Sequence, residues 1–203
     1  MSSSHVVLAS GSPRRLELLR SIGVDPTVVV PDVDESLHAG EDAVTYVRRV
    51  AAAKLDAVLH SLDSAAVGTI VVAADTTVEV DGAILAKPVD DADAMRMLML
   101  LRGRAHRVHT GFAVAVAGPG CRGVEWEGHV EVVTSTVTFR EVAIPDLISY
   151  VDSGEPRDKA GAYAIQGGAA SFVERLDGDR NAVIGLPLDR VAAVAASLGS
   201  PLV

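Results

Sequence analysis

The sequence predicts an α/β fold in which helices flank a mixed β-sheet. Helical patterns alternate with short strand patterns in the first half of the chain, and two long strand patterns follow one another later. This order favours a mixed sheet over a purely parallel one. Apolar residues make up 49% of the 203 residues but aromatic residues only 3%, so alanine, valine and leucine must fill the core. The length fits one domain, which we expect to span residues 1–203.

The first third of the chain predicts two strands and two helices. Residues 5–10 and 26–31 are apolar runs typical of strands. Between them a helix is expected to run to about residue 22, with Ser12 as its cap and Pro13 in its first position. Residues 42–62 predict a long helix, and Lys54 lies on its apolar stripe rather than on its polar face. The stripe includes Val44, Val47, Ala51, Val58 and Leu62.

The middle of the chain predicts the centre of the sheet. Residues 69–75 form an unbroken apolar run that ends with Asp75, as in a strand covered on both faces. Residues 77–85 predict a hairpin with Asp81 and Gly82 as its two-residue turn. A helix over 90–101 and two long strands, about 106–117 and 124–140, are expected to follow.

The last third is less regular. We expect a short helix over 145–153, a structured glycine-rich loop over 153–170, a hairpin around Asp177 and Gly178, and a final helix from about Leu188.

Composition excludes several classes of protein. The net charge of −9 argues against general nucleic-acid binding. The one cysteine, Cys121, cannot form an internal disulfide, and without zinc-ligand spacing this predicts a cytoplasmic protein. We expect no signal peptide and no membrane span, because no apolar run reaches about 18 residues.

Two motif-like stretches predict no site. Residues 118–123, GPGCRG, match the letters of a dinucleotide-binding loop, but an alternating strand follows them where that motif needs a helix. They therefore indicate a hairpin loop. His106 and His109 are three apart in a predicted strand, so they point to opposite faces and are a poor metal pair.

The strand–turn–helix junction at residues 8–19, LASGSPRRLELL, predicts an anion site. Arg14 and Arg15 stand in the first helical turn, where the helix dipole is already positive, so a negative group is expected nearby. Free backbone N–H groups, the hydroxyl of Ser10 and two guanidinium groups suit phosphate oxygens. The alternative is an ordinary capped helix with a solvated arginine pair, and on this stretch alone both interpretations stay open.

Four further residues extend this site. Taken singly, Asp75 could form a turn, Lys54 could reach water past the apolar stripe, and Lys87 and Glu35 could be surface charges. Together, one acid at the end of a strand, several cations and an anion-binding helix start suit phosphate-ester or anhydride chemistry. Mg²⁺ would fit a chain without a His/Cys cluster, because it needs few protein carboxylates.

The chain resembles the Maf family of nucleoside triphosphate pyrophosphatases, once known as septum-formation inhibitors. The matching segments, in family order over about residues 6–190, are LASGSPRRLELL, DES at 34–36, YVRRVAAAKL, VVAADTTVEVDGAILAKP, GRAHRVHTGFAV, PRDKAGAYAIQG and VIGLPL. The resemblance implies a twisted mixed sheet, two lobes around a deep cleft, and a homodimer. It also implies hydrolysis between the α and β phosphates of a nucleoside triphosphate with Mg²⁺ or Mn²⁺, which clears surplus or non-standard nucleotides.

The resemblance also implies roles for single residues. Asp75 would accept the proton of the attacking water and hold the metal together with Glu35. Phosphate oxygens would be bound by Ser10, Arg14, Arg15, Lys54 and Lys87.

Base preference follows from residues that distinguish subgroups of the family. Thr76 after the aspartate and Gln166 in KAGAYAIQG match the subgroup that prefers dTTP and UTP. The amide of Gln166 can donate to and accept from a pyrimidine edge. The small residues after Gln166 could widen the base pocket. Two alternatives stay open: a purine enzyme acting on 7-methyl-GTP, and a nucleotide-binding regulator of cell division with little turnover.

Overall fold

The structure is a computed structural model that describes residues 5–62, 65–118 and 125–202. Its described part contains one seven-stranded mixed sheet in the order β2-β1-β3-β5-β6-β7, with β4 paired to β3. β1 runs parallel to β2 and β3, and the other pairs are antiparallel. The strands are β1 (Val6–Ala9), β2 (Thr27–Val28), β3 (Ile70–Val80), β4 (Ala83–Leu85), β5 (Ala105–Gly118), β6 (Glu125–Phe139) and β7 (Val173–Asp177).

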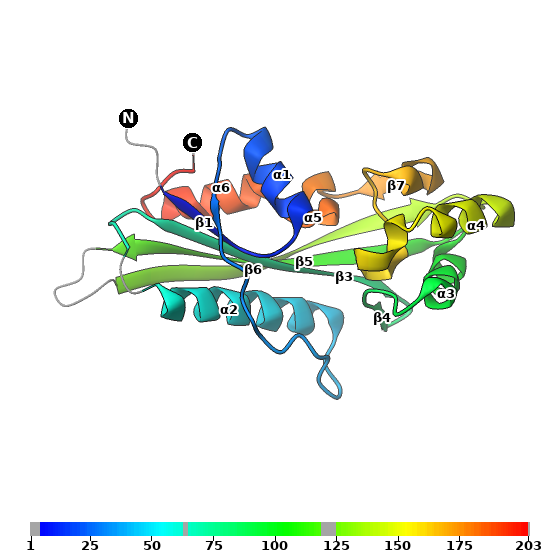
Figure 1. Cartoon of the computed structure of the whole chain (residues 1–203), viewed down its shortest axis with the longest axis horizontal. Helices are drawn as coiled ribbons and strands as arrows, with labels where there is room; N and C mark the ends of the chain where they lie inside the picture. Colours follow the sequence, from blue (N-terminus) through cyan, green and yellow to red (C-terminus); the bar gives the residue numbers. More distant parts are fainter. Residues whose placement is uncertain (1–4, 63–64, 119–124, 203) are drawn as a thin grey trace.

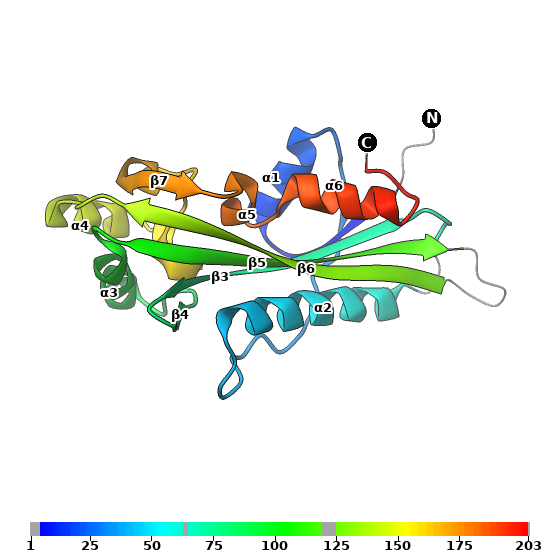
Figure 2. The ribbon, with the colours of Figure 1, turned by 180° about the vertical axis from the view of Figure 1, so that it is seen from behind.

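Helices cover the two faces of the sheet differently at its two ends (Figures 1 and 2). At one end α2 covers one face, and α1 and α6 cover the other. The opposite end carries α3 and α4. None of the described helices is both long and apolar enough to cross a membrane. The α-helices are α1 (Pro13–Ser21), α2 (Ala43–Ser61), α3 (Asp91–Leu101), α4 (Ile144–Asp152), α5 (Arg180–Ile184) and α6 (Leu188–Ser197), and the 3₁₀-helices are η1 (Glu155–Asp158), η2 (Ala160–Ala162) and η3 (Gly168–Phe172).

The core follows this division. Alternate residues of β1, β3 and β5 face opposite sides, so Val7 and Val71 pack against α2, whereas Leu8 and Val72 pack beneath α1 and α6. A third cluster fills the other end, where the far halves of β3, β5 and β6 meet α3 and α4. Strands β3, β5 and β6 run through both ends and join them (Figure 1).

The predicted mixed α/β fold is confirmed, with three local corrections. Asp75 does not end its strand, because β3 continues to Val80 and the polar residues pair with β5 at the register Asp75↔Gly111. No hairpin forms around Asp177 and Gly178; β7 leads into helix α5, because the Asp179 carboxylate accepts from the backbone N–H groups of the first helical turn.

The third correction concerns two helices. Ser12 occupies the cap position of α1, but its side chain makes no capping hydrogen bond, and Ser10 Oγ accepts from the Ser12 N–H instead. Val44 of α2 is 40% exposed and so does not belong to the apolar stripe. The glycine-rich residues 119–124 lie outside the described residues, and the strands on either side of them pair antiparallel.

The turn at Asp81 and Gly82 is confirmed. Val80 pairs with Ala83, and the two residues between them have φ of 52° and 81°. Both values are positive, as a two-residue hairpin turn of this kind requires.

Candidate active site

The candidate site lies at a gap in the sheet. On one edge of β3, β1 pairs with Ile70–Ala73 and β4 pairs with Val78–Val80. Residues 74–77 between them pair with β5 on the other edge, but no described strand pairs with them on this edge. A cavity of about 600 Å³ opens at this gap. Since successive strand residues point to opposite faces, side chains from both faces of β3 reach the same cavity. All nine residues predicted from the sequence line it: Ser10, Arg14, Arg15, Glu35, Lys54, Asp75, Thr76, Lys87 and Gln166.

On the α2 side, two carboxylates converge on one ammonium group. Lys54 Nζ lies 2.8 Å from Asp75 Oδ1 and 3.0 Å from Glu35 Oε2. Lys54 and Asp75 are each only 6% exposed, whereas Glu35 lies on an exposed loop. Lys54 therefore lies on the apolar stripe because it has a buried anionic partner, and it does not extend into water.

Helix α2 also holds the loop that carries Glu35. Tyr46 Oη donates to the Glu35 carbonyl oxygen at 3.0 Å, and Arg49 donates to the Ser36 carbonyl oxygen at 2.8 Å while pairing with Glu41. Burial, reinforced by the nearby Asp75 charge, raises the pKa of Tyr46 to about 12. The phenol therefore stays protonated at neutral pH and remains a donor to the loop.

On the opposite face, Arg15 forms a buried network. Its guanidinium group donates to the Gly185 carbonyl oxygen (2.8 Å), to Ser10 Oγ (2.9 Å) and to Thr76 Oγ1 (3.2 Å). Thr76 is further bonded to the hydroxyl of Thr110 at 2.9 Å. Burial lowers the pKa of Arg15, and the charge of Asp75 across β3 opposes this shift. Opposite charges thus lie on the two sides of the gap: the Asp75 carboxylate on one face of β3 and the Arg15 guanidinium group on the other.

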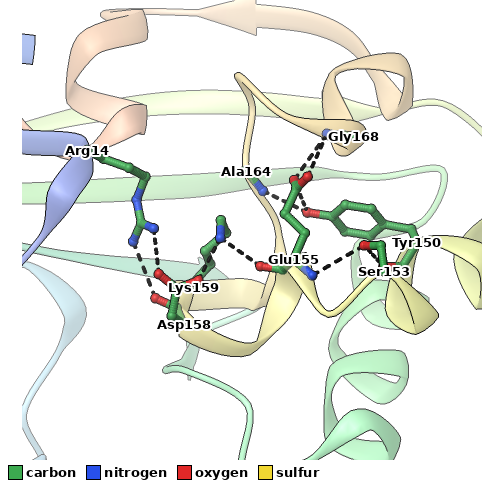
Figure 3. A network of polar contacts seen from close by, with 8 residues as sticks. All are labelled: Arg14, Tyr150, Ser153, Glu155, Asp158, Lys159, Ala164 and Gly168. Carbon is green, nitrogen blue, oxygen red and sulfur yellow. Dashed lines mark hydrogen bonds and ion pairs between the residues drawn. The ribbon is translucent and has the colours of Figure 1, made fainter. Parts of the chain in front are cut away.

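The rim of the cavity carries the remaining predicted residues. Arg14 forms an ion pair with Asp158 at 2.8 Å, and Asp158 also pairs with Lys159 (Figure 3). Lys87 and Gln166 are exposed, and Lys87 makes no ion pair within the described part of the chain. The cavity lining therefore includes five cationic and three anionic side chains, which is a local excess of positive charge in an acidic protein.

One wall of the cavity is apolar. The hydroxyl of Tyr163 is hydrogen-bonded to His106 Nε2 at 2.8 Å, and Tyr163 is only 6% exposed. Burial lowers the pKa of His106 to about 4, so the imidazole is neutral near pH 7. An apolar wall beside a cationic region suits a ligand with a ring at one end and phosphates at the other. The wall is formed by Val78, Val108, Tyr163, Ile165, Val183 and Ile184.

The two carboxylates fit the magnesium or manganese ion that the sequence predicts. Among the described residues, no group of three or more His, Cys, Asp or Glu side chains could hold a metal by itself. Asp75 and Glu35, however, both lie within hydrogen-bonding distance of one atom, Lys54 Nζ. Mg²⁺ typically takes one or two carboxylates and completes its shell with water and substrate phosphates, so this pair suits such an ion.

Comparison with known proteins assigns the family. A family model described as "Maf-like protein" matches residues 5–198. The chain belongs to the Maf family. The resemblance noted in the sequence is thus confirmed over nearly the whole chain.

Curated relatives share this extent. A protein of Hahella chejuensis named "dTTP/UTP pyrophosphatase" is 43% identical over 194 residues, covering 96% of this chain and 92% of the relative. Proteins of the same name from Vibrio cholerae and Myxococcus xanthus are each 44% identical and cover 93% and 97% of this chain, and 95% and 94% of their own length. A solved structure titled "The structure of the Staphylococcus aureus Ham1 protein" is similar with a TM-score of 0.47 and 20% identity, covering 97% of this chain and 98% of that one.

Three residues at the site were not predicted from the sequence. Asp158 and Lys159 lie in the polar part of the glycine-rich loop, and the adjacent opposite charges were the available signal. Tyr46 gave no signal, because it acts on a backbone carbonyl oxygen 11 residues away rather than on a charged group.

Proposed function

We propose that this Maf protein is a nucleoside triphosphate pyrophosphatase. It hydrolyses the α–β phosphoanhydride of dTTP, UTP or similar nucleotides to the nucleoside monophosphate and pyrophosphate. The observation that carries the proposal is the gap in the sheet, where Asp75 faces a cation-rich cavity with an apolar wall. The names of the curated relatives support the choice of dTTP and UTP.

In this reaction Asp75 is the proton acceptor. Its carboxylate takes a proton from the water that attacks the α phosphorus; the new P–O bond forms as the bond to the bridging oxygen breaks, and pyrophosphate leaves. Ser10, Arg14, Arg15, Lys54 and Lys87 bind phosphate oxygens, and the cations offset the charge that develops on them. Asp75 and Glu35 would hold Mg²⁺ or Mn²⁺, which supplies further neutralisation of the polyphosphate.

The base occupies the apolar end of the cavity. Gln166 at the rim offers an amide to the pyrimidine edge, and Thr76 acts by fixing Arg15 on the phosphate side. We also propose that the whole chain acts as one domain whose two ends are lobes on either side of the cavity. The protein would work in the cytoplasm, as a homodimer.

Pyrophosphate release tests this function. We would assay dTTP, UTP, CTP, GTP and 7-methyl-GTP with Mg²⁺ or Mn²⁺, using the wild type, Asp75→Asn and the control Asp56→Asn, which alters an exposed carboxylate on α2. We expect dTTP and UTP to react fastest, and Asp75→Asn to lose about 10²–10⁴-fold in rate while still binding nucleotide.

Three results would contradict the proposal. Faster turnover of 7-methyl-GTP would replace the pyrimidine preference by a purine one. Full activity of Asp75→Asn would show that Asp75 is not the proton acceptor. Bound nucleotide without any pyrophosphate release would leave a regulator in place of an enzyme.

A further inference from the structure

An internal carboxylate bridges two cations at the rim of the cavity (Figure 3). Arg14 Nη1 lies 2.8 Å from one oxygen of Asp158, and Lys159 Nζ lies 2.6 Å from the other. Arg14 Nη2 also donates to the Asp158 carbonyl oxygen at 3.3 Å. Arg14 belongs to α1, whereas Asp158 ends η1, 144 residues later. The carboxylate therefore links the two sides of the cavity that the substrate must enter.

The bridging carboxylate of Asp158 is ionised at neutral pH. Burial opposes ionisation of Asp158, but the hydrogen bonds from Lys159 and Arg14 outweigh it and lower its pKa to about 2. The Asp158 side chain remains 60% exposed, whereas those of Arg14 and Lys159 are 22% and 13% exposed. The two cations are thus held in place, and the anion between them lies on the solvent side.

The segment that carries Asp158 is also held by hydrogen bonds that do not involve the Asp158 carboxylate. The carboxylate of Glu155 accepts from Tyr150 Oη at 2.9 Å and from the Gly168 N–H at 3.1 Å. Tyr150 Oη in turn accepts from the Ala164 N–H at 3.1 Å (Figure 3). Lys159 Nζ is also held by the Glu155 carbonyl oxygen at 2.7 Å. Opening the bridge would therefore leave Lys159 in position to bind another anion.

A guanidinium group and an ammonium group that share one carboxylate can equally share a phosphate. Their donors already converge on two oxygens of an anion, and a polyphosphate carries more negative charge than a carboxylate. We propose that Lys159 is a further phosphate-binding residue, and that Asp158 is the internal anion that occupies Lys159 and Arg14 until the polyphosphate of the substrate displaces it. This inference rests on the proposed pyrophosphatase function and extends its site.

The proposal predicts opposite effects for neighbouring residues. If Asp158 loses its charge, it no longer competes with phosphate for the two cations, so the protein binds phosphate groups more tightly. If Lys159 loses its charge, the protein binds phosphate groups more weakly. Arg157 is the matched control, because it stands in the same 3₁₀-helix but pairs with Asp91 of α3 and does not line the cavity.

The test is calorimetric titration with inorganic pyrophosphate, which needs no turnover. We expect Asp158→Asn to bind pyrophosphate about threefold to tenfold tighter, on the scale of two partly exposed ion pairs, and Arg157→Met to bind as the wild type does. Lys159→Met should bind at least threefold more weakly, with Lys159→Gln as a second variant that keeps a donor for the Glu155 carbonyl oxygen. The KM for UTP should shift in the same direction as each affinity.

Unchanged or weaker binding by Asp158→Asn would overturn the role of the internal anion, because the carboxylate would then only be orienting the two cations. Unchanged binding by both Lys159 variants would overturn the phosphate contact. Neither result depends on hydrolysis. A wild type that binds pyrophosphate as expected but releases none from nucleotides would contradict the pyrophosphatase function alone.

Discussion

Two adjacent arginines at the start of α1 have different surroundings. Arg14 lies at the rim of the cavity and can exchange Asp158 for a phosphate. Arg15 is only 8% exposed, and its guanidinium group donates three hydrogen bonds to other groups of the protein. The two arginines predicted to bind phosphate therefore differ: Arg14 has an ion-pair partner that a phosphate can displace, whereas Arg15 is a cation fixed by its hydrogen bonds to the protein. The fixed cation positions Ser10 and Thr76 and adds its charge to the phosphate side of the cavity.

Arg15→Lys tests this division of roles. An ammonium group cannot reach three acceptors placed around a planar fork, so at least one buried partner loses its donor. We expect the free energy of unfolding to fall by about 2–4 kcal/mol, the scale of one or two lost hydrogen bonds to a buried charge. Urea denaturation measures this loss, and the KM for UTP should rise. Arg20→Lys is the control, since Arg20 pairs with Asp25 at the exposed end of the same helix. Equal stability of both variants would show that the Arg15 network contributes nothing.

At the scale of elements, strand β3 shows why the sequence gives only part of the site. The apolar run stops at Ala74, so Asp75, Thr76 and Thr77 resemble the end of a strand. The strand continues because the backbone of these residues pairs with β5. The side chains of Asp75 and Thr76 also have partners from elsewhere in the chain, Lys54 for Asp75 and Arg15 for Thr76. Such partners lie far away in the sequence, and periodicity carries no information about them. In the same way, the cap of α5 depends on Asp179 and replaces the predicted hairpin.

The packing of α2 against the sheet depends on one glycine. A Cβ at Gly111 of β5 would lie within 2.6 Å of the carbonyl carbon of Val47 and would collide with its oxygen, so the helix backbone approaches the strand as closely as it can. This approach brings Lys54 to Asp75, because Gly111 is the β5 partner of Asp75 in the ladder.

Gly111→Ala should therefore impair stability and activity together. Backbone cannot move aside as a flexible side chain would, and we expect a loss of about 1–3 kcal/mol in the free energy of unfolding, together with slower UTP hydrolysis. Thermal unfolding and pyrophosphate release measure the two effects. Gly128→Ala is the control in the neighbouring strand β6, where the nearest atom to a Cβ lies at 3.6 Å. A stable and fully active Gly111→Ala would mean that α2 can shift without moving Lys54.

At the scale of the whole molecule, the nine predicted site residues come from positions 10 to 166 and meet in one cavity. Spacing alone could not bring them together; their joint resemblance to one family did, and the fold then placed them. The sequence did not reveal which charged side chains of the cavity pair with one another. Asp158 and Lys159 are adjacent in the chain, and only the fold shows that they meet Arg14 across the cavity. The sheet gap was equally hidden, because it depends on where β1 ends and β4 begins along β3.

The far end of the molecule makes the stability of the whole fold sensitive to mild acid. Burial against Phe139 and Tyr163 lowers the pKa of His106 to about 4, from about 6.5 in an unfolded chain. As pH falls from 6.5 towards 4, His106 becomes protonated in the unfolded chain but stays neutral in the folded chain, so the free energy of unfolding decreases. Burial also lowers the pKa of His109, which acts in the same direction. Carboxylates with lowered pKa values, such as Asp158, lose their contribution only below about pH 4.

Urea denaturation at pH 7.0, 5.5 and 4.5 isolates the histidine contribution. We expect the wild type to lose about 2–3 kcal/mol over this range from His106 alone. His106→Gln keeps an amide that can bond to the Tyr163 hydroxyl but cannot titrate, so its stability should depend less on pH even if it is lower at pH 7.0. The control His60→Gln replaces an exposed histidine at the end of α2. Parallel pH profiles for the wild type and His106→Gln would show that the pKa of His106 is the same in the folded and the unfolded chain, and would contradict the lowering of this pKa by burial. In that case the hydrogen bond to Tyr163, on the apolar wall of the cavity, would be made by a cation at pH 5.5 and 4.5.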